Sequence, residues 1–300
     1  MEFILTGAVE LGLIYGLMAL GLFVSYRILD VADLTVDGSF TTGAAVSVVC
    51  ALAGHPVLGL LLSVPAGLAA GLLTALLQTK LRVQPILAGI LTMTFLYSVN
   101  LRILGQRANV SLLGQESVFS LTRELLPPSL GLFAKLPVIL LAVGLAVVFL
   151  AVFLRTKTGL SVRATGDNVA MVRASSSHPH VTTAIALGRA NALVALSGGL
   201  LAQYQQSADM SMGVGVVIVG LASVIIGEVV AGKPTLNRHI LAVVAGAVVY
   251  RLLIALALQA ASANDLKAIS AIIVTLAISF PALREQLAVR KLKKEGMRNV

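Results

Sequence analysis

Two short polar motifs offer the clearest chemistry in this sequence, and each consists of an acidic residue followed two positions later by a hydroxyl residue. The motifs are Asp33-Leu-Thr35 and Asp209-Met-Ser211, and each precedes an apolar segment that contains glycine. A carboxylate or hydroxyl oxygen at the start of a helix accepts hydrogen bonds from backbone amides that lack a partner within the helix. The motifs therefore indicate either ordinary helix caps or polar groups along a path for a solute.

Other candidate reactive groups do not match the spacing that their chemistry requires. Residues 227–234 (GEVVAGKP) nearly match a phosphate-binding loop, but Pro234 stands where a hydroxyl residue would reach magnesium. The segment also ends an apolar run, whereas a phosphate-binding loop follows a strand and opens a helix. The histidines lack metal-site spacing, and no nucleophile–base arrangement is visible. We therefore expect no catalytic residues, no metal and no cofactor, so the chain is not expected to be an enzyme.

The composition indicates a membrane protein. Hydrophobic residues make up 58% of the 300 residues and charged residues 12%, whereas soluble chains have about 45–50% and about 25%. So few charged side chains cannot cover the surface of a soluble globule, which excludes a cytosolic enzyme and a disordered chain. Aromatic residues make up only 5%, which argues against a stacking surface for nucleic acid.

Long apolar runs predict an all-α, polytopic bundle of about nine membrane-spanning helices, because a span needs about 20 mainly apolar residues. The first run is not expected to be a signal peptide, because no basic segment precedes it. The run at 39–54 is short and contains glycine, which is typical of a broken helix. The predicted spans are residues 3–26, 39–54, 56–79, 83–104, 136–154, 181–205, 211–231, 237–258 and 264–283.

The distribution of basic residues predicts that the N-terminus lies outside the cell and the C-terminus inside. Loops on the C-terminal side carry most of the Lys and Arg residues, which is the pattern of cytoplasmic loops. The net charge of +9 is thereby explained by the anionic inner leaflet, without a nucleic-acid partner. These cytoplasmic residues are Arg27, Lys80, Arg82, Arg155, Lys157, Arg163, Arg173, Lys233, Arg238 and those of the basic tail, residues 284–300.

An internal repeat relates the two halves of a single transmembrane domain, residues 1–300. Residues 12–20 align with 188–196, and residues 33–36 align with 209–212 at the same offset without a gap. The matched segments open spans that cross in opposite directions, so the halves, about 1–135 and 181–283, form an inverted repeat. In such folds the solute path lies between the repeats, near interrupted helices. The predicted pathway residues are Asp33, Thr35, Asp37, Ser39, Asp209, Ser211, Gly213 and Gly215.

The cytoplasmic loop, residues 155–180, contains a short predicted helix at 166–173. Asp167 or Asn168 would cap it, and the serines at 175–177 and Pro179 would stop it. A helix of one or two turns is not stable alone in water, so it needs a surface to pack against. That surface is either a groove on a cytosolic motor protein or the lipid headgroups. The residues of this candidate docking helix are Gly166, Asp167, Asn168, Val169, Met171, Val172 and Arg173.

Residues 12–39, 155–173 and 188–232 together resemble the permeases of bacterial ABC importers, in the branched-chain amino acid and ribose group. The most telling stretch is residues 158–173 (TGLSVRATGDNVAMVR), and residues 197–204 (SGGLLAQY) and 213–228 add to it. Within that group the sequence most resembles permeases that are paired with tryptophan/tyrosine-type binding lipoproteins. After Ala174 the family continues with a small residue and glycine, whereas this chain has Ser175-Ser-Ser-His-Pro. This departure affects the geometry with which the chain leaves the short helix.

The resemblance implies a multi-pass protein of the bacterial cytoplasmic membrane. It also implies a pathway formed by a homodimer of two permease copies, two cytosolic ATPase subunits, an extracytoplasmic substrate-binding protein and a coupling helix at 166–173. We therefore expect a permease subunit that moves a small polar organic solute, with an amino acid, and in particular an aromatic one, favoured. A self-sufficient, ion-coupled secondary transporter is the alternative that an inverted repeat also allows. A membrane scaffold without a pathway is the third hypothesis.

Overall fold

The computed structural model is a bundle of helices with one two-stranded ribbon, and it describes residues 2–125, 133–174, 178–232, 235–260, 268, 270–277 and 279. Pro56, Pro85 and Pro179 lie at helix starts, where the missing amide hydrogen costs nothing. The elements are α1 (Glu2–Leu22), the π-helix η1 (Phe23–Ile28), α2 (Thr35–Leu52), α3 (Pro56–Thr79), α4 (Pro85–Ile103), β1 (Asn109–Ser111), α5 (Val118–Leu125), α6 (Leu136–Phe153), α7 (Lys157–Asp167), α8 (Val169–Ala174), α9 (Pro179–Gln205), β2 (Ser207–Asp209), α10 (Val216–Ala231) and α11 (Leu236–Ala260).

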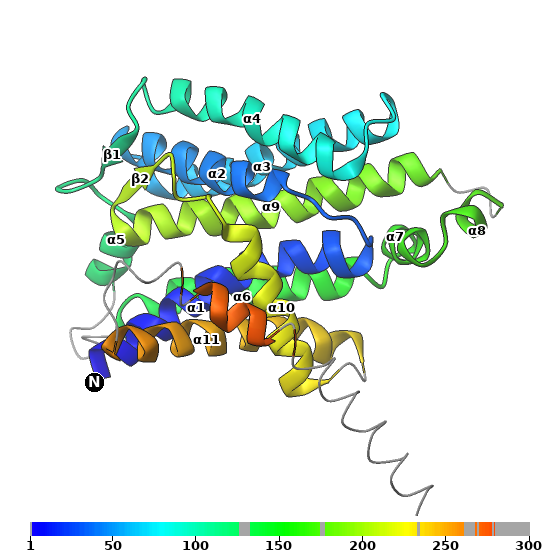
Figure 1. Ribbon diagram of the computed structural model, residues 1–300. Coiled ribbons are helices and arrows are strands. Elements are labelled where there is room, and N and C mark those ends of the chain that lie inside the picture. The colour runs from blue at the N-terminus through cyan, green and yellow to red at the C-terminus, as the bar shows by residue number, and fades with distance from the viewer. Residues whose placement is uncertain are drawn as a thin grey trace, which may run out of the picture.

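Helix α9 forms the centre of the bundle and packs against α1, α2 and α3. The ribbon β1–β2 and α5 lie at one end of the bundle, together with the N-terminus, and α7 and α8 lie at the opposite end (Figure 1). We call these the β1–β2 end and the α7–α8 end. The strands are antiparallel, with Asn109 opposite Asp209. The ribbon therefore joins a loop of the first half of the chain to a loop of the second.

Seven of the described helical segments are long and apolar enough to cross a membrane. They correspond to α1 with η1, α2, α3, α4, α6, α9 and α11, and α10 is a shorter apolar helix. The predicted all-α, polytopic membrane fold is confirmed. Only half of the residues of the predicted span 264–283 are described, so the count of nine spans and the orientation remain predictions.

The interrupted helices begin at other residues than the sequence predicts. The span predicted at 39–54 begins earlier, at Thr35, and the span predicted at 211–231 begins later, at Val216. Gly215, with φ of 80°, occupies the left-handed region directly before α10. Residues 211–215 therefore form a turn, and a helix cannot start before this turn is complete.

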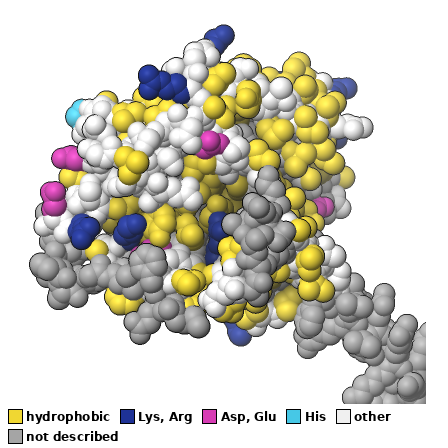
Figure 2. Space-filling model, turned by 60° about the vertical axis from the view of Figure 1, so that its left-hand side comes forward, with side chains coloured by type: hydrophobic (Ala, Val, Ile, Leu, Met, Phe, Trp, Pro, Cys, Tyr) yellow, Lys and Arg dark blue, Asp and Glu magenta, His cyan; other side chains and the backbone are white. Residues whose placement is uncertain are grey.

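The flanks of the bundle expose large apolar side chains. Leu61 on α3, Phe95 on α4 and Leu141 on α6 are all exposed, and Figure 2 shows broad apolar areas on the surface with charged side chains lying singly among them. A soluble monomer rarely exposes such continuous apolar area. These surfaces are suited to contact with lipid chains.

The two halves of the chain are related as an inverted repeat. Helix α1 runs from the β1–β2 end to the α7–α8 end, and α9 runs in the opposite direction (Figure 1). Gly12 of α1 lies against Val248 of α11, and Gly188 of α9 lies against Leu72 of α3. The offset of the repeat aligns Gly12 with Gly188 and Leu72 with Val248, so the two contacts are equivalent. The inverted repeat is therefore confirmed, whereas its limits at about 1–135 and 181–283 remain predictions.

Candidate functional site

A buried polar network joins the two halves at the start of α2. The Asn191 side chain of α9 donates from Nδ2 to Asp33 Oδ2 at 2.7 Å, and its Oδ1 accepts from Ser39 Oγ at 2.6 Å. Asp33 Oδ1 also accepts from the backbone amide of Thr35 at 2.9 Å. Asp33, Thr35 and Ser39 are all buried, and the hydrogen bonds of Asp33 and Ser39 to Asn191 fasten the start of α2 to α9. Asp33, Thr35 and Ser39 do not line either of the two cavities that are described below.

Asp37 caps a helix of the other half of the chain. Its Oδ2 accepts from the backbone amide of Gly215 at 2.9 Å, and its Oδ1 accepts from the amide of Val217 at 3.0 Å. Gly213 lies directly against the Asp37 carbonyl oxygen, where a Cβ atom would overlap it. Capping was expected within each motif, but Asp37 on α2 instead satisfies the first amides of α10 across the repeat interface.

A cavity of about 410 Å³ lies beside this cap, between α2, α4 and residues 210–214. We call it the Asp37 pocket. Asn100 is 1% exposed and donates from Nδ2 to the Gly38 carbonyl at 3.3 Å, while its Oδ1 has no hydrogen-bond partner among the described residues. The pocket is lined by Asp37, Gly38, Thr41, Met93, Thr94, Tyr97, Ser98, Asn100, Met210, Gly213 and Val214.

The lining of the Asp37 pocket combines an acidic group, an amide oxygen and an apolar wall. Such concave sites, apolar with a few polar groups, are typical of binding sites for small organic molecules. Asp37 and Gly213 were predicted from the sequence, whereas Tyr97, Met93 and Asn100 were not. The signal that could have found Asn100 is a polar amide within the apolar segment of α4.

Asp209 lies in β2, at the β1–β2 end, and Ser211 lies in the turn that follows β2. The Asp209 carboxylate accepts from the Ser211 amide at 2.7 Å and from Asn109 Nδ2 at 3.2 Å. This amide contact repeats the Asp33–Thr35 contact in the other half. The Ser211 hydroxyl and amide, with the Asn109 side chain, hold the pKa of the Asp209 carboxyl below its ordinary value of 3.8. An inverted repeat places equivalent residues at opposite depths, so the two motifs do not meet.

The Asp209 turn predicts a specific acid sensitivity. Because the pKa of Asp209 is lower in the folded protein, its contribution to stability is complete above its ordinary, unfolded-state pKa of 3.8 and is lost as pH falls through the lower folded-state pKa. Asp209→Asn is expected to remove this part of the loss. Thermal melting of the detergent-solubilised protein between pH 5 and pH 3 checks this, and an unchanged pH profile in the variant would contradict it.

The α7–α8 segment differs in its boundaries from the single helix predicted at 166–173. Gly166 and Asp167 belong to α7, and Asn168, in an extended conformation, separates α7 from α8. The Asn168 side chain accepts from the Met171 amide at 3.1 Å, so it caps α8 and competes with continuation of the helix. Of the two residues predicted as caps, the structure thus favours Asn168. The predicted stop at residues 175–177 lies outside the described residues.

Helix α8 presents its apolar side chains unequally. Val172 is 1% exposed and anchors the helix, whereas Met171 is 61% exposed and Val169 is also exposed. Helix α7 is fixed to the bundle by a 2.8 Å hydrogen bond between Thr165 and Thr182 of α9, and its Gly166 lies against the Ile28 carbonyl. A short helix on a fixed support therefore carries an apolar tip at the α7–α8 end.

Replacing Asp37 is expected to weaken both the α10 cap and the pocket. Asp37→Ala removes both acceptors of the α10 amides, which costs about 1–2 kcal/mol of stability, and it removes the pocket's carboxylate. Asp37→Asn keeps one acceptor oxygen but not the charge. We expect solute uptake to fall by about tenfold or more in both variants, while the melting temperature falls mainly in Asp37→Ala. Uptake at the wild-type rate in Asp37→Ala would contradict the placement of the pocket on the pathway.

Two inverted halves of apolar helices, with a partly polar cavity at their interface, define a polytopic membrane transport protein. The family model described as "Branched-chain amino acid transport system / permease component" matches residues 4–279. The chain therefore belongs to this family of transport-system permeases, which confirms the resemblance in the sequence. The family and the seven apolar helices identify it as a multi-pass membrane protein, consistent with the bacterial cytoplasmic membrane.

Two relatives are similar to the chain in sequence, and one solved structure is similar to it in fold. The chain is 34% identical over 264 residues, covering 87% of its own length and 86% of the relative, to the tyrosine transport system permease protein of Clostridioides difficile (strain R20291). It is 36% identical over 227 residues, covering 75% and 77%, to the uncharacterized protein RP368 of Rickettsia prowazekii (strain Madrid E). Its fold matches a chain of PsaBC from Streptococcus pneumoniae, solved in complex with Fab, with a TM-score of 0.53, 10% identity and coverage of 92% and 90%.

Proposed function

We propose that this chain is the translocating subunit of an ATP-driven importer for an amino acid with an aromatic side chain. The Asp37 pocket is the observation that carries the proposal. The Asp37 carboxylate and Asn100 Oδ1, which has no partner within the described part of the chain, are acceptors for a substrate ammonium group. Tyr97, Met93 and Met210 provide aromatic and thioether surface for an aromatic ring. The similarity to a tyrosine transport system permease supports the same solute class.

The energy source in this proposal is a partner chain. Met171 and Val169 form an exposed apolar tip on α8, at the end that we place in the cytoplasm. A methionine on a short, anchored helix suits insertion into an apolar groove of another protein. We assign this groove to an ABC ATPase subunit, with a second permease copy completing the pathway and an extracytoplasmic binding protein delivering the solute. The predicted coupling role of residues 166–173 is thus concentrated in α8, supported by the end of α7.

Reconstitution distinguishes this function from an ion-coupled carrier. Proteoliposomes that hold the permease, its ATPase and its binding protein are expected to accumulate labelled L-tyrosine when ATP is supplied on the ATPase side. The permease alone, tested in the same lipid with a sodium or proton gradient, is expected to accumulate none. Uptake by the permease alone would overturn the proposal in favour of the secondary transporter, and a failure of ATP to drive uptake in the complete assembly would overturn it directly.

A further inference from the structure

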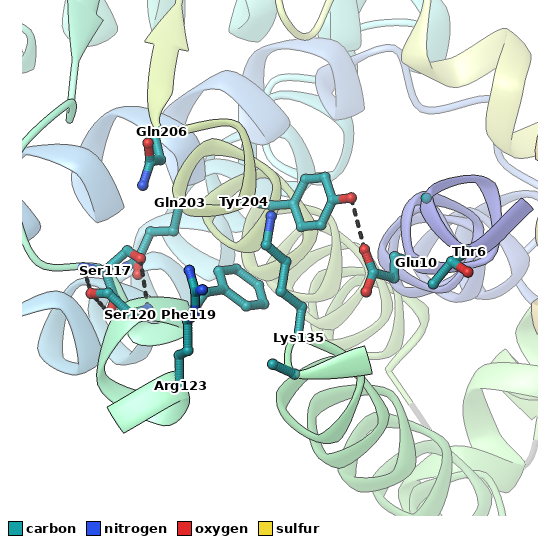
Figure 3. Close-up of a pocket in the computed structure, with 12 residues that line it drawn as sticks. Thr6, Glu10, Ser117, Phe119, Ser120, Arg123, Lys135, Gln203, Tyr204 and Gln206 are labelled. Atoms are coloured by element: carbon teal, nitrogen blue, oxygen red, sulfur yellow. Dashed lines mark hydrogen bonds between the residues drawn. The ribbon is translucent and has the colours of Figure 1, made fainter. Parts of the chain in front are cut away.

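A second cavity, of about 360 Å³, lies at the β1–β2 end, away from the Asp37 pocket. Its wall is formed by α1, α5, the start of α6 and the end of α9 (Figure 3). We call it the Glu10 cavity. The lining residues that the following argument uses are Glu10, Phe119, Arg123, Lys135 and Tyr204.

Glu10 is a buried acid, and one of its carboxylate oxygens has no partner among the residues that the structure describes. It is 4% exposed, and its Oε2 accepts from the Tyr204 hydroxyl at 2.8 Å. Its Oε1 has no hydrogen-bond partner among the described residues. A carboxylate inside an apolar helix is costly unless it is paired, and such residues most often mark a functional site. The free oxygen therefore requires a donor, and a cationic donor compensates best.

Two cations lie across the same cavity. The Lys135 ammonium stands 4.2 Å from the centre of the Tyr204 ring, and its side chain extends from the start of α6 to that ring (Figure 3). Arg123 projects from α5 on the same side, and within the described chain neither cation forms an ion pair with Glu10. The Glu10 carboxylate and the Lys135 ammonium thus both contact the Tyr204 side chain, and Arg123 lines the same cavity.

We propose that the Glu10 cavity is an outer binding site for the zwitterionic group of an α-amino acid. Glu10 Oε1 accepts from the ligand's ammonium, and Lys135 and Arg123 hold its carboxylate. The rings of Phe119 and Tyr204 meet edge to face, with centroids 5.7 Å apart, and form an aromatic wall for the ligand's side chain. The inference rests on the proposed amino-acid function and adds a second site to it.

The test measures binding to the full-length permease in lipid nanodiscs with three probes. L-tyrosine carries both charged groups, tyramine carries only the ammonium, and 3-(4-hydroxyphenyl)propionate carries only the carboxylate. Measurements are made in a Tyr97→Ala background, which impairs the Asp37 pocket and leaves the Glu10 cavity intact. Isothermal titration calorimetry gives the affinities, and thermal melting verifies that each variant is folded.

The two ends of the ligand predict opposite effects of two variants. Glu10→Gln is expected to lower the affinity for L-tyrosine and for tyramine by about tenfold or more, because a hydrogen bond to a charged group is lost. The affinity for 3-(4-hydroxyphenyl)propionate is expected to stay unchanged. Lys135→Gln is expected to lower the affinity for L-tyrosine and for the propionate and to leave the affinity for tyramine unchanged. Asp30→Asn and Lys157→Gln, exposed at the α7–α8 end, are the matched controls. Lys135 lies nearer the rim than Glu10, so this variant retains the test if Glu10→Gln does not fold.

Each outcome separates this site from the proposed function. The outer site is supported if Glu10→Gln weakens the binding of only those probes that carry an ammonium group and Lys135→Gln weakens the binding of only those that carry a carboxylate. Equal affinities in Glu10→Gln, Lys135→Gln and their parent overturn it, even where ATP-driven uptake of L-tyrosine by the wild-type assembly continues. Absence of that uptake overturns the proposed function, which the reconstitution measures independently of these binding constants.

Discussion

Replacing Met171 by glutamate is expected to separate the permease from its ATPase while leaving the helical bundle folded. Met171 is 61% exposed on α8, so the substitution removes little internal packing. In the assembly it would place a charge in an apolar groove, and central apolar anchors of interfaces are typically worth 2 kcal/mol or more, about 30-fold in affinity. The rate of ATP-driven uptake is expected to fall by at least the same factor. The combination with Asp167→Lys, which reverses the charge at the end of α7, is expected to abolish co-purification.

The matched control for Met171→Glu carries the same change at the other end of the bundle. Leu113 is 77% exposed at the β1–β2 end, so Leu113→Glu adds an equal charge on an equally apolar surface remote from α8. Co-purification of the ATPase with this control is expected to match the wild type. A normal yield of the complex from the Met171→Glu protein would contradict the docking role of α8.

Replacing Gly43 by leucine is expected to prevent folding of the bundle. Helices α2 and α9 cross so closely at Gly43 that a Cβ atom on this residue would overlap the carbonyl group of Ala195. The backbone of a central helix cannot move aside without opening its other contacts. The loss in free energy of unfolding should therefore exceed the value of about 1–3 kcal/mol that is typical of overpacking, and it should approach the whole stability of a domain. Fluorescence-detected size-exclusion chromatography of the solubilised protein measures the loss of monodisperse material.

Gly144 provides the control for Gly43. It lies on α6, and a Cβ atom added there would meet no atom within 4 Å. Gly144→Leu is therefore expected to express, elute and melt like the wild type. If the Gly43→Leu protein is equally monodisperse and melts at the same temperature, the close crossing of α2 and α9 is wrong.

The fold could largely be predicted because the membrane imposes a simple rule on the chain. Apolar runs of about 20 residues must be helices, and the runs at 56–79 and 181–205 correspond to α3 and α9 within two residues. The repeat followed from aligned small and polar residues, and Gly12 and Gly188 do make equivalent contacts. The starts of α2 and α10 were placed less well, because turns and a cap from another helix determine them.

The contacts of the site could be predicted only in part, because they join residues that are distant in the sequence. Asp33, Asp37 and Ser39 were identified by type, but their partners on α9 and α10 depend on how helices cross. Asn191 of α9 is the hydrogen-bond partner of both Asp33 and Ser39, and it was not foreseen. Glu10 had a visible signal, since an acid in an apolar run is a functional hypothesis by default.

The coupling segment illustrates a local competition that composition alone did not resolve. The sequence predicted one helix over 166–173, whereas the Asn168 side chain binds the Met171 amide and separates α7 from α8. Asn at such a position favours a cap over a helix interior. Val172 is the one buried residue of α8, whereas Met171 is exposed and available to a partner.

The most direct test of an externally powered pathway is the structure of the permease assembled with its ATPase, determined by electron cryomicroscopy in a lipid nanodisc. The proposed function predicts that α8 is seated in a groove of the nucleotide-hydrolysing subunit, with Met171 buried at the contact. An active assembly in which Met171 faces lipid or solvent and α8 touches no ATPase would contradict it.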